Sequence, residues 1–330
     1  MESWSDGAGA TQRTAVVGWL LDADPAIRWQ VLRDLTDAPA PVVAAERGRV
    51  EHKGWGARLL ALQGPDGQWG GGTYMPLWTA TAWTLMELRT LGLDPRSPGA
   101  RRAVARVRAN SRWEHAGEPF FAGEVEPCIN GMAVAIGAYF GEDVRAIVGR
   151  LLDEQMDDGG WNCEQENGSV RGSFHTTIDV LEGLLEYERA TGGDATVAEA
   201  RLRGQAYLVD RRMLRRLSTG EVIDPSWTAF AYPTRYVYDV LRGLDYLRDA
   251  GADRDARLSE GIDLVRAKRR PDGLWLLESR HPGAEHVDAE ADVGRPSRWN
   301  TLRALRVLRW YEGEAAGGRQ GTVTAAQGEE

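Results

Sequence analysis

The feature that most restricts the fold is a helical unit that recurs along nearly the whole chain. The inner helices of four units are predicted to begin at residues 28, 78, 128 and 175, so consecutive starts are 50, 50 and 47 residues apart. Two further units follow, with inner helices near Pro233 and Trp299, which makes six. Such a period is typical of repeat architectures. Because six hairpins can close into a ring without an uncapped end, we predict an all-α (α/α)6 toroid.

The repeat also sets the expected domain limits. We predict one toroid domain over residues 11–316, because the helical spacing of apolar residues begins near Thr11 and continues into the last unit. Residues 1–10 are small and polar, and residues 317–330 form a polar tail. Such segments bury too little apolar surface to offset the entropy of ordering, so we expect both ends to be disordered.

Composition narrows the class of partner. The chain of 330 residues has a net charge of −9, which disfavours nucleic acid and anionic membranes as partners. It contains no apolar run of the roughly 20 residues that a membrane span needs, and its N-terminus lacks the layout of a signal peptide. We therefore expect a cytoplasmic protein that binds a small molecule. Its oligomeric state is left open.

Three stretches share one pattern, in which a helix end is followed by an Asp-Gly or Gly-Gly turn and a tryptophan. They are Leu60–Gln63 with Gly67–Trp69, Leu151–Gln155 with Gly159–Trp161, and Leu264–Arg270 with Gly273–Trp275. The pattern resembles the QW repeats of the squalene cyclase and protein prenyltransferase superfamily. This resemblance implies a closed toroid of helical hairpins and a small-molecule substrate of isoprenoid type. The third copy has Arg269-Arg270 where glutamine would be, and generic Asp-Gly turns between helices are the alternative interpretation.

The resemblance extends to two inner-helix starts. In the catalytic subunit of protein prenyltransferases, an acidic-x-Cys segment begins one inner helix and a His-Thr segment begins the next, and together they hold zinc. Glu126-Pro127-Cys128 and Phe174-His175-Thr176 resemble these two segments. In cyclases of the squalene-hopene type, an Asp-x-Asp-Asp acid motif stands at the first position. Glu124-Val125-Glu126-Pro127 is a loose match to that motif.

The residues themselves also favour a metal site. Cys128 and His175 stand on the predicted first turns of adjacent inner helices, and Cys163, the other cysteine of the chain, stands on the loop between them. Thiolate, imidazole and carboxylate are the ligands that zinc prefers. We therefore predict zinc held by Cys128, Cys163 and His175, with Glu126 as fourth ligand or general acid/base. The alternatives are two small buried cysteines with a hydrogen-bonded core histidine, or a closed structural zinc.

Aromatic and charged residues near the inner-helix starts suggest a binding funnel. The predicted substrate-binding residues are Trp78, Phe121, Tyr232, Arg298 and Trp299, and the predicted catalytic residues are Glu124, Glu126 and Arg235. Arginines can hold an anionic part of a substrate. The alternatives are core packing for the aromatics, and ordinary ion pairs with Asp224 or Asp292 for the two arginines.

These expectations favour a zinc-dependent enzyme that acts on a small, partly apolar molecule in an aromatic cavity. Zinc would activate a thiolate for alkyl or prenyl-type transfer, or a water molecule for hydrolysis or elimination. Two alternatives stay open: a metal-free class II terpene cyclase with Glu126 as its acid, and a binding module with structural zinc.

Overall fold

The structure is a computed structural model that describes residues 7–36, 38–114 and 117–313. These ranges contain helices and isolated β-bridges but no strand. None of the helices described is both long and apolar enough to cross a membrane.

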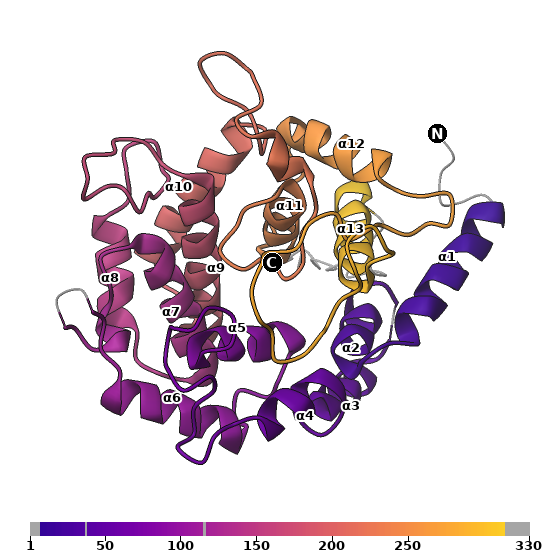
Figure 1. Ribbon diagram of the computed structural model, residues 1–330. Coiled ribbons are helices and arrows are strands. Elements are labelled where there is room, and N and C mark those ends of the chain that lie inside the picture. Colours follow the sequence, from indigo (N-terminus) through magenta and orange to yellow (C-terminus); the bar gives the residue numbers. More distant parts are fainter. Residues whose placement is uncertain (1–6, 37, 115–116, 314–330) are drawn as a thin grey trace, which may run out of the picture.

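The helices form two layers around a common centre (Figure 1). The inner layer consists of α2 (Pro25–Asp34), α5 (Thr81–Leu91), α7 (Pro127–Phe140), α9 (Phe174–Thr191), α11 (Val240–Asp249) and α13 (Arg298–Glu312). The outer layer consists of α1 (Gly7–Leu21), α3 (Ala40–Gly48), α4 (Gly54–Ala61), α6 (Pro98–Asn110), α8 (Arg145–Asp153), α10 (Ala195–Asp210) and α12 (Ser259–Ala267). Short 3-10 turns lie at Arg49–Glu51, Phe120–Ala122, Pro225–Thr228 and Ala256–Leu258.

The inner layer is closed because its first and last helices meet. On α13, the Arg306 guanidinium donates to Gln30 Oε1 at 2.9 Å and lies 3.3 Å from Asp34 Oδ2, both on α2. On the other side of α2, the Trp29 indole donates to the backbone oxygen of Leu91 at the end of α5, at 2.8 Å. The predicted all-α toroid is therefore confirmed.

The three tryptophan turns have the same local structure. Trp69, Trp161 and Trp275 are almost completely buried. Each indole N–H donates to the backbone oxygen of the residue ten positions earlier, at 2.7–2.8 Å. Each tryptophan backbone N–H donates to a threonine hydroxyl in the first turn of the next inner helix, at 3.0–3.1 Å. The buried indole therefore fixes each outer helix to the inner helix that follows it.

Glutamine has a defined role in two of these turns. The side-chain amides of Gln63 and Gln155 each donate to two backbone oxygens, one in their own turn and one on the next outer helix, at 2.8–2.9 Å. In the third turn, Arg269 stands at the equivalent position, six residues before the tryptophan, and donates to Gln12 Oε1 on α1 at 3.1 Å. The Gln12 side-chain amide donates in turn to the backbone oxygen of Pro271 at 2.5 Å, so the third turn is also linked to a neighbouring outer helix, with the glutamine on the helix instead of in the turn.

Helices α7 and α9 approach each other closely. A Cβ atom at Gly131 would lie only 2.5 Å from the backbone oxygen of Asp179, so any other residue would push the two helices apart. This contact sets the positions of the loops and first turns around Cys128 and Cys163.

Several element boundaries differ from the sequence prediction. Helix α3 and the 3-10 turn after it were not predicted. Helix α5 begins at Thr81 rather than at Trp78, and α11 begins at Val240 rather than at Pro233. The reason is left-handed backbone: φ is +68° at Trp78 and +52° at Arg235, which an α-helix cannot contain.

The chain ends allow only a partial comparison. Helix α1 begins at Gly7, inside the segment 1–10 that was expected to be disordered. Residues 1–6 and the predicted tail 317–330 lie outside the described residues.

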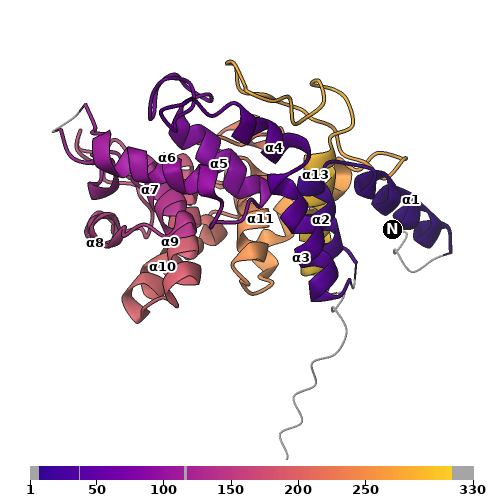
Figure 2. The ribbon, with the colours of Figure 1, turned by 90° about the horizontal axis from the view of Figure 1, so that it is seen from below.

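A long loop before α13 lies over the end of the ring where the inner helices begin (Figures 1 and 2). The Trp78 indole donates to the backbone oxygen of Pro282 at 2.7 Å. His286 Nε2 lies 2.7 Å from the backbone oxygen of Thr79. These contacts fix the loop to the segment that leads into α5.

Candidate metal centre

Glu126, Cys128 and Cys163 form a cluster at the start of α7. One carboxylate oxygen and the two Sγ atoms all lie within 4.8 Å of one another, and all three residues are half-buried. Glu126 directly precedes α7, and Cys128 is the second residue of that helix. Pro127 between them suits the first helical position because its φ is already helical and it has no N–H to satisfy. Cys163 comes from the loop between Trp161 and α9.

The cluster is held by a few direct contacts. The Cys128 thiol donates to Glu126 Oε2 over 3.7 Å. The Thr176 hydroxyl, in the first turn of α9, donates to Cys163 Sγ at 3.3 Å and accepts the Cys163 backbone N–H at 3.3 Å. Each sulfur therefore has a polar neighbour that fixes its position.

The two thiols differ in acidity. A hydrogen bond from Cys128 lowers the pKa of Cys163, even though burial acts in the opposite direction, and the Thr176 hydroxyl lowers that pKa further. The pKa of Cys128 is raised, because it donates to Cys163 and because it is buried. Cys163 is therefore the more acidic thiol of the pair.

The residues present fit a zinc ion. Ligands 2.0–2.3 Å from tetrahedral zinc are separated from one another by roughly 3.5–3.8 Å. The observed separation of 3.7 Å between Cys128 Sγ and Glu126 Oε2 agrees with this value. Two thiolates and one carboxylate would leave a fourth position for water or substrate.

The structure places His175 outside this cluster, although the sequence analysis predicted it as a ligand. The described cluster contains Glu126 instead. His175 Nδ1 accepts the backbone N–H of Tyr238 at 2.8 Å, and its ring packs edge-on against Trp227 with centroids 5.6 Å apart. Burial lowers the pKa of His175. Its neighbour Thr176 makes the contact with Cys163.

Glu124 supports the cluster from the loop before α7. Glu124 is buried, and its Oε2 accepts the backbone N–H of Glu126 at 2.7 Å. Its backbone N–H and C=O are both bonded to the Asn130 side chain, at 2.7 Å each. Glu124 therefore positions Glu126, and the structure places it behind the cluster.

Arg235 holds the loop that covers the ring. Its guanidinium pairs with Glu285 at 2.7 Å and lies 4.9 Å from the centroid of Trp78. Neither Asp224 nor Asp292 is its partner. Trp78 is buried beneath the same loop. These two residues join the loop to the ring.

The other predicted substrate-binding residues separate into two groups. Phe121 packs beside Phe120 and Gly137, and Arg298 donates to the backbone oxygen of Trp19 and lies over its ring. Both serve packing between elements. Tyr232 and Trp299 are instead stacked 4.5 Å apart, and both line the cavity in the middle of the ring.

An open cavity of about 900 Å³ lies beside the cluster. Its wall includes Glu124, two residues before Glu126, and Ile129, the residue after Cys128, together with the aromatic residues Tyr74, Trp113 and Phe120, but none of the three cluster residues themselves. Burial raises the pKa of Tyr74, and the nearby Cys128 and Glu126 raise it further, so Tyr74 stays a neutral hydrogen-bond donor or acceptor.

Sequence reasoning missed Thr176 and Tyr74. Thr176 stands in the His-Thr segment that was singled out, so the segment was informative although its histidine points elsewhere. Tyr74 belongs to a loop with no helical spacing, and nothing in the sequence links it to α7.

Comparisons with known proteins give a structural similarity only. No family model matches the chain, and no curated protein matches it. Among solved structures, the chain is similar to the apo structure of the type II terpene cyclase MstE from Scytonema, with 18% sequence identity and a TM-score of 0.44. The alignment covers 93% of this chain and 97% of that one.

Proposed function

We propose that Glu126, Cys128 and Cys163 bind one zinc ion and that the protein is a zinc-dependent enzyme acting on a small, partly apolar molecule. The observation that carries this proposal is the approach of three ligand atoms to within 4.8 Å of one another. Glu126 and Cys128 come from the start of α7, whereas Cys163 comes from the separate loop before α9.

The surroundings favour a catalytic ion over a purely structural one. Structural zinc sites have four protein ligands, whereas catalytic sites have three and an open position. The cluster offers three ligands and lies beside the cavity of about 900 Å³. Aromatic residues on the cavity wall suit an apolar substrate, and Arg106 and Arg112 suit a polar or anionic group on it.

Zinc bound here would supply Lewis acidity, either to a substrate thiol or to a water molecule. The chain's own residues would orient the reactants. Thr176 fixes Cys163, and Glu124 fixes Glu126 through its backbone N–H. Tyr74, which stays neutral, can donate to or accept from a polar group of the substrate. Transfer to a thiol and hydrolysis or elimination both fit this arrangement.

The first test is metal analysis of the purified protein. We expect about one zinc per chain in the wild type and loss of zinc from Cys128→Ser and Cys163→Ser, because each variant removes one of three protein ligands. His175→Gln is the matched control, since this residue lies outside the cluster. Zinc retained in both cysteine variants, or lost only from the histidine variant, would contradict this ligand set.

Two other functions remain to be separated from this one. A metal-free terpene cyclase using Glu126 as its acid would cyclise a linear isoprenoid after exhaustive chelation and would lose activity in Glu126→Gln. A binding module with structural zinc would unfold when the metal is removed. A zinc enzyme should stay folded without zinc, lose activity and regain it when zinc is returned.

A further inference from the structure

The hole of the ring is a separate cavity with an unusual wall. It has a volume of about 460 Å³ and is lined by eight arginines but only four carboxylates. The carboxylates belong to Glu182, Glu186, Asp245 and Asp249. The cavity therefore has more cationic than anionic side chains on its surface, and none of the three candidate zinc ligands lines it.

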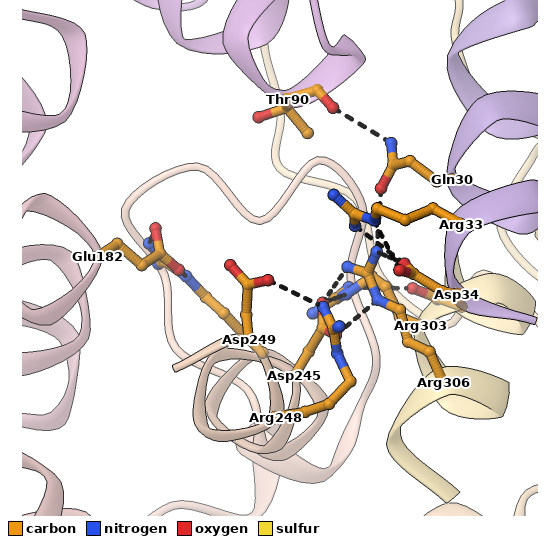
Figure 3. A network of polar contacts seen from close by, with 12 residues as sticks. Gln30, Arg33, Asp34, Thr90, Glu182, Asp245, Arg248, Asp249, Arg303 and Arg306 are labelled. Atoms are coloured by element: carbon orange, nitrogen blue, oxygen red, sulfur yellow. Dashed lines mark hydrogen bonds and ion pairs between the residues drawn. The ribbon is translucent and has the colours of Figure 1, made fainter. Parts of the chain in front are cut away.

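Several arginines of this wall share the same carboxylates. Asp245 accepts hydrogen bonds from Arg306 and Arg248, and Arg303 lies 3.8 Å from it. Figure 3 shows these side chains gathered on one side of the ring, with Glu182 across from them on α9. Arg303 is almost fully buried, and the nearest carboxylate oxygens, of Asp239 and Asp245, are both 3.8 Å away. The arginine side chains of this wall therefore have fewer close carboxylate partners than there are guanidinium groups.

Two further arginines of the wall, one on α2 beside Asp34 (Figure 3) and one on α3, flank one tryptophan. The guanidinium carbons of Arg33 and Arg47 lie 4.6 and 5.2 Å from the centroid of Trp29. Arg33 pairs with Asp34. Arg47 donates to the backbone oxygen of Gly92 and to Tyr139 Oη, at 2.9 and 2.8 Å. Within the described chain, Arg47 forms no ion pair with a carboxylate, and these two hydrogen bonds use two of its five N–H donors.

Carboxylates that do not line the cavity but contact its arginines reduce the excess of arginines over acids without removing it. Asp34, Asp179 and Asp239 contact cavity arginines from the protein side. Together with the four carboxylates of the wall they are seven acids against eight arginines. Burial also raises the pKa of Asp179, which pairs with Arg242 at 2.6 Å. An added anion would therefore find uncompensated positive charge here.

We propose that the arginine-lined cavity binds a compact polyanion, such as a diphosphate or a tricarboxylate, with Arg33 and Arg47 beside Trp29 as its principal contacts. Guanidinium groups form paired, charge-assisted hydrogen bonds with phosphate and carboxylate oxygens. A polyanion is required because the donors come from several helices and surround a volume larger than one monovalent ion fills. The inference goes beyond the proposed zinc site, because the two sites share no residue.

The experiment is titration calorimetry with inorganic diphosphate, and separately with citrate, to distinguish phosphate from carboxylate chemistry. We expect one site per chain, with affinity that falls as salt is added. Arg47→Gln should weaken binding roughly ten- to a hundredfold, because a hydrogen bond to a charged group is lost. Arg33→Gln should act in the same direction. Arg108→Gln is the control, since its side chain is 63% exposed and pairs with Glu142 outside the ring.

Each other outcome would overturn the proposal. Binding of neither anion at millimolar concentration excludes the site. Equal weakening in the Arg108 variant would indicate general attraction to surface charge. Loss of binding in Cys163→Ser, with binding retained in Arg47→Gln, would place the anion at the metal centre. If Arg47→Gln fails to fold, the more exposed Arg33 still provides the test. Failure of the zinc proposal would leave these results unchanged.

Discussion

The two polar regions of the ring differ in how their charges are balanced. In the arginine-lined cavity, Asp245 is buried, which alone would raise its pKa, but Arg306 and Arg248 hold that pKa well below its usual range. At the start of α7, no ion pair with arginine or lysine reaches Glu126 within the described chain. One region therefore stabilises the closed ring by internal ion pairs, whereas the other groups a carboxylate and two thiols with no basic side chain paired to Glu126.

The largest effect should come from breaking the ion pairs that close the ring. Arg306→Met removes the partner of Asp245 and Asp34 while keeping much of the side-chain volume. Because it removes one of several cationic partners of these two buried carboxylates, while Arg248 and Arg33 remain, we expect a loss of about 3 kcal/mol in the free energy of unfolding, measured by urea denaturation.

Arg145→Met on α8 is the control for this measurement. The Arg145 side chain is 78% exposed and pairs only with Asp143 next to it, so its loss should cost less than about 1 kcal/mol. Equal losses in the two variants would show that the Arg306 cluster contributes no more than a surface pair. The arginine-lined cavity would then contribute no special stabilisation to the closed ring.

A smaller effect is expected at the metal centre from Thr176→Val. The change keeps the shape of the side chain but removes the hydroxyl that contacts Cys163 Sγ and its backbone N–H. Partners of metal ligands typically contribute 10–100-fold to metal affinity, so we expect about a tenfold loss of zinc affinity in competition with a chelator.

Thr177→Val is a matched comparison one residue along α9. The Thr177 hydroxyl accepts a hydrogen bond from the backbone N–H of Trp161 and so stabilises the tryptophan turn before α9, whereas the hydrogen bonds with Cys163 are made by Thr176. This variant should lower stability and leave zinc affinity unchanged. If both variants lose zinc affinity equally, the effect comes from the position of α9, and Thr176 has no specific role.

The fold could be predicted because its signals are local and repeated. Trp69, Trp161 and Trp275 recur at helix ends, and each one makes the same hydrogen bond ten residues back. The helical spacing of apolar residues supplied the rest. The starts of α5 and α11 were misplaced because Trp78 and Arg235 adopt left-handed backbone that is stabilised by tertiary contacts. The spacing of apolar residues along the sequence does not reveal those tertiary contacts.

The candidate site was predictable only in part, for a related reason. Cys128 and Cys163 do lie together as expected, since one stands in the first turn of α7 and the other on the loop that leads into the adjacent helix α9. Whether Thr176 or His175 contacts the cluster depends on the direction of each side chain within the first turn of α9. Thr176 points to Cys163, whereas His175, one residue earlier, points to Tyr238. A rotation of about 100° between consecutive helical residues separates the two outcomes.

The last predicted effect concerns an acid that lies outside both regions. Glu87 stands on α5, one turn after Trp83, and burial raises its pKa to about 7 although Arg235 acts in the opposite direction. The folded state therefore binds this proton more tightly than the unfolded state, whose value is near 4.5. Its contribution to stability is fully present below pH about 4.5 and is lost as the pH rises through 7.

Glu87→Gln should therefore flatten the dependence of stability on pH. Between pH 5 and pH 8, the free energy of unfolding of the wild type should fall by about 1–3 kcal/mol more than that of the variant, measured by urea denaturation. We expect the lower end of this range, because the Glu87 side chain keeps some contact with solvent. Glu118→Gln, on an exposed loop, controls for the general loss of a carboxylate. Asp179 titrates in the same range and keeps part of the slope in both proteins. A profile for Glu87→Gln that matches the wild type would mean that Glu87 is compensated as fully as Asp245, and the balance of charge would then be uniform around the ring.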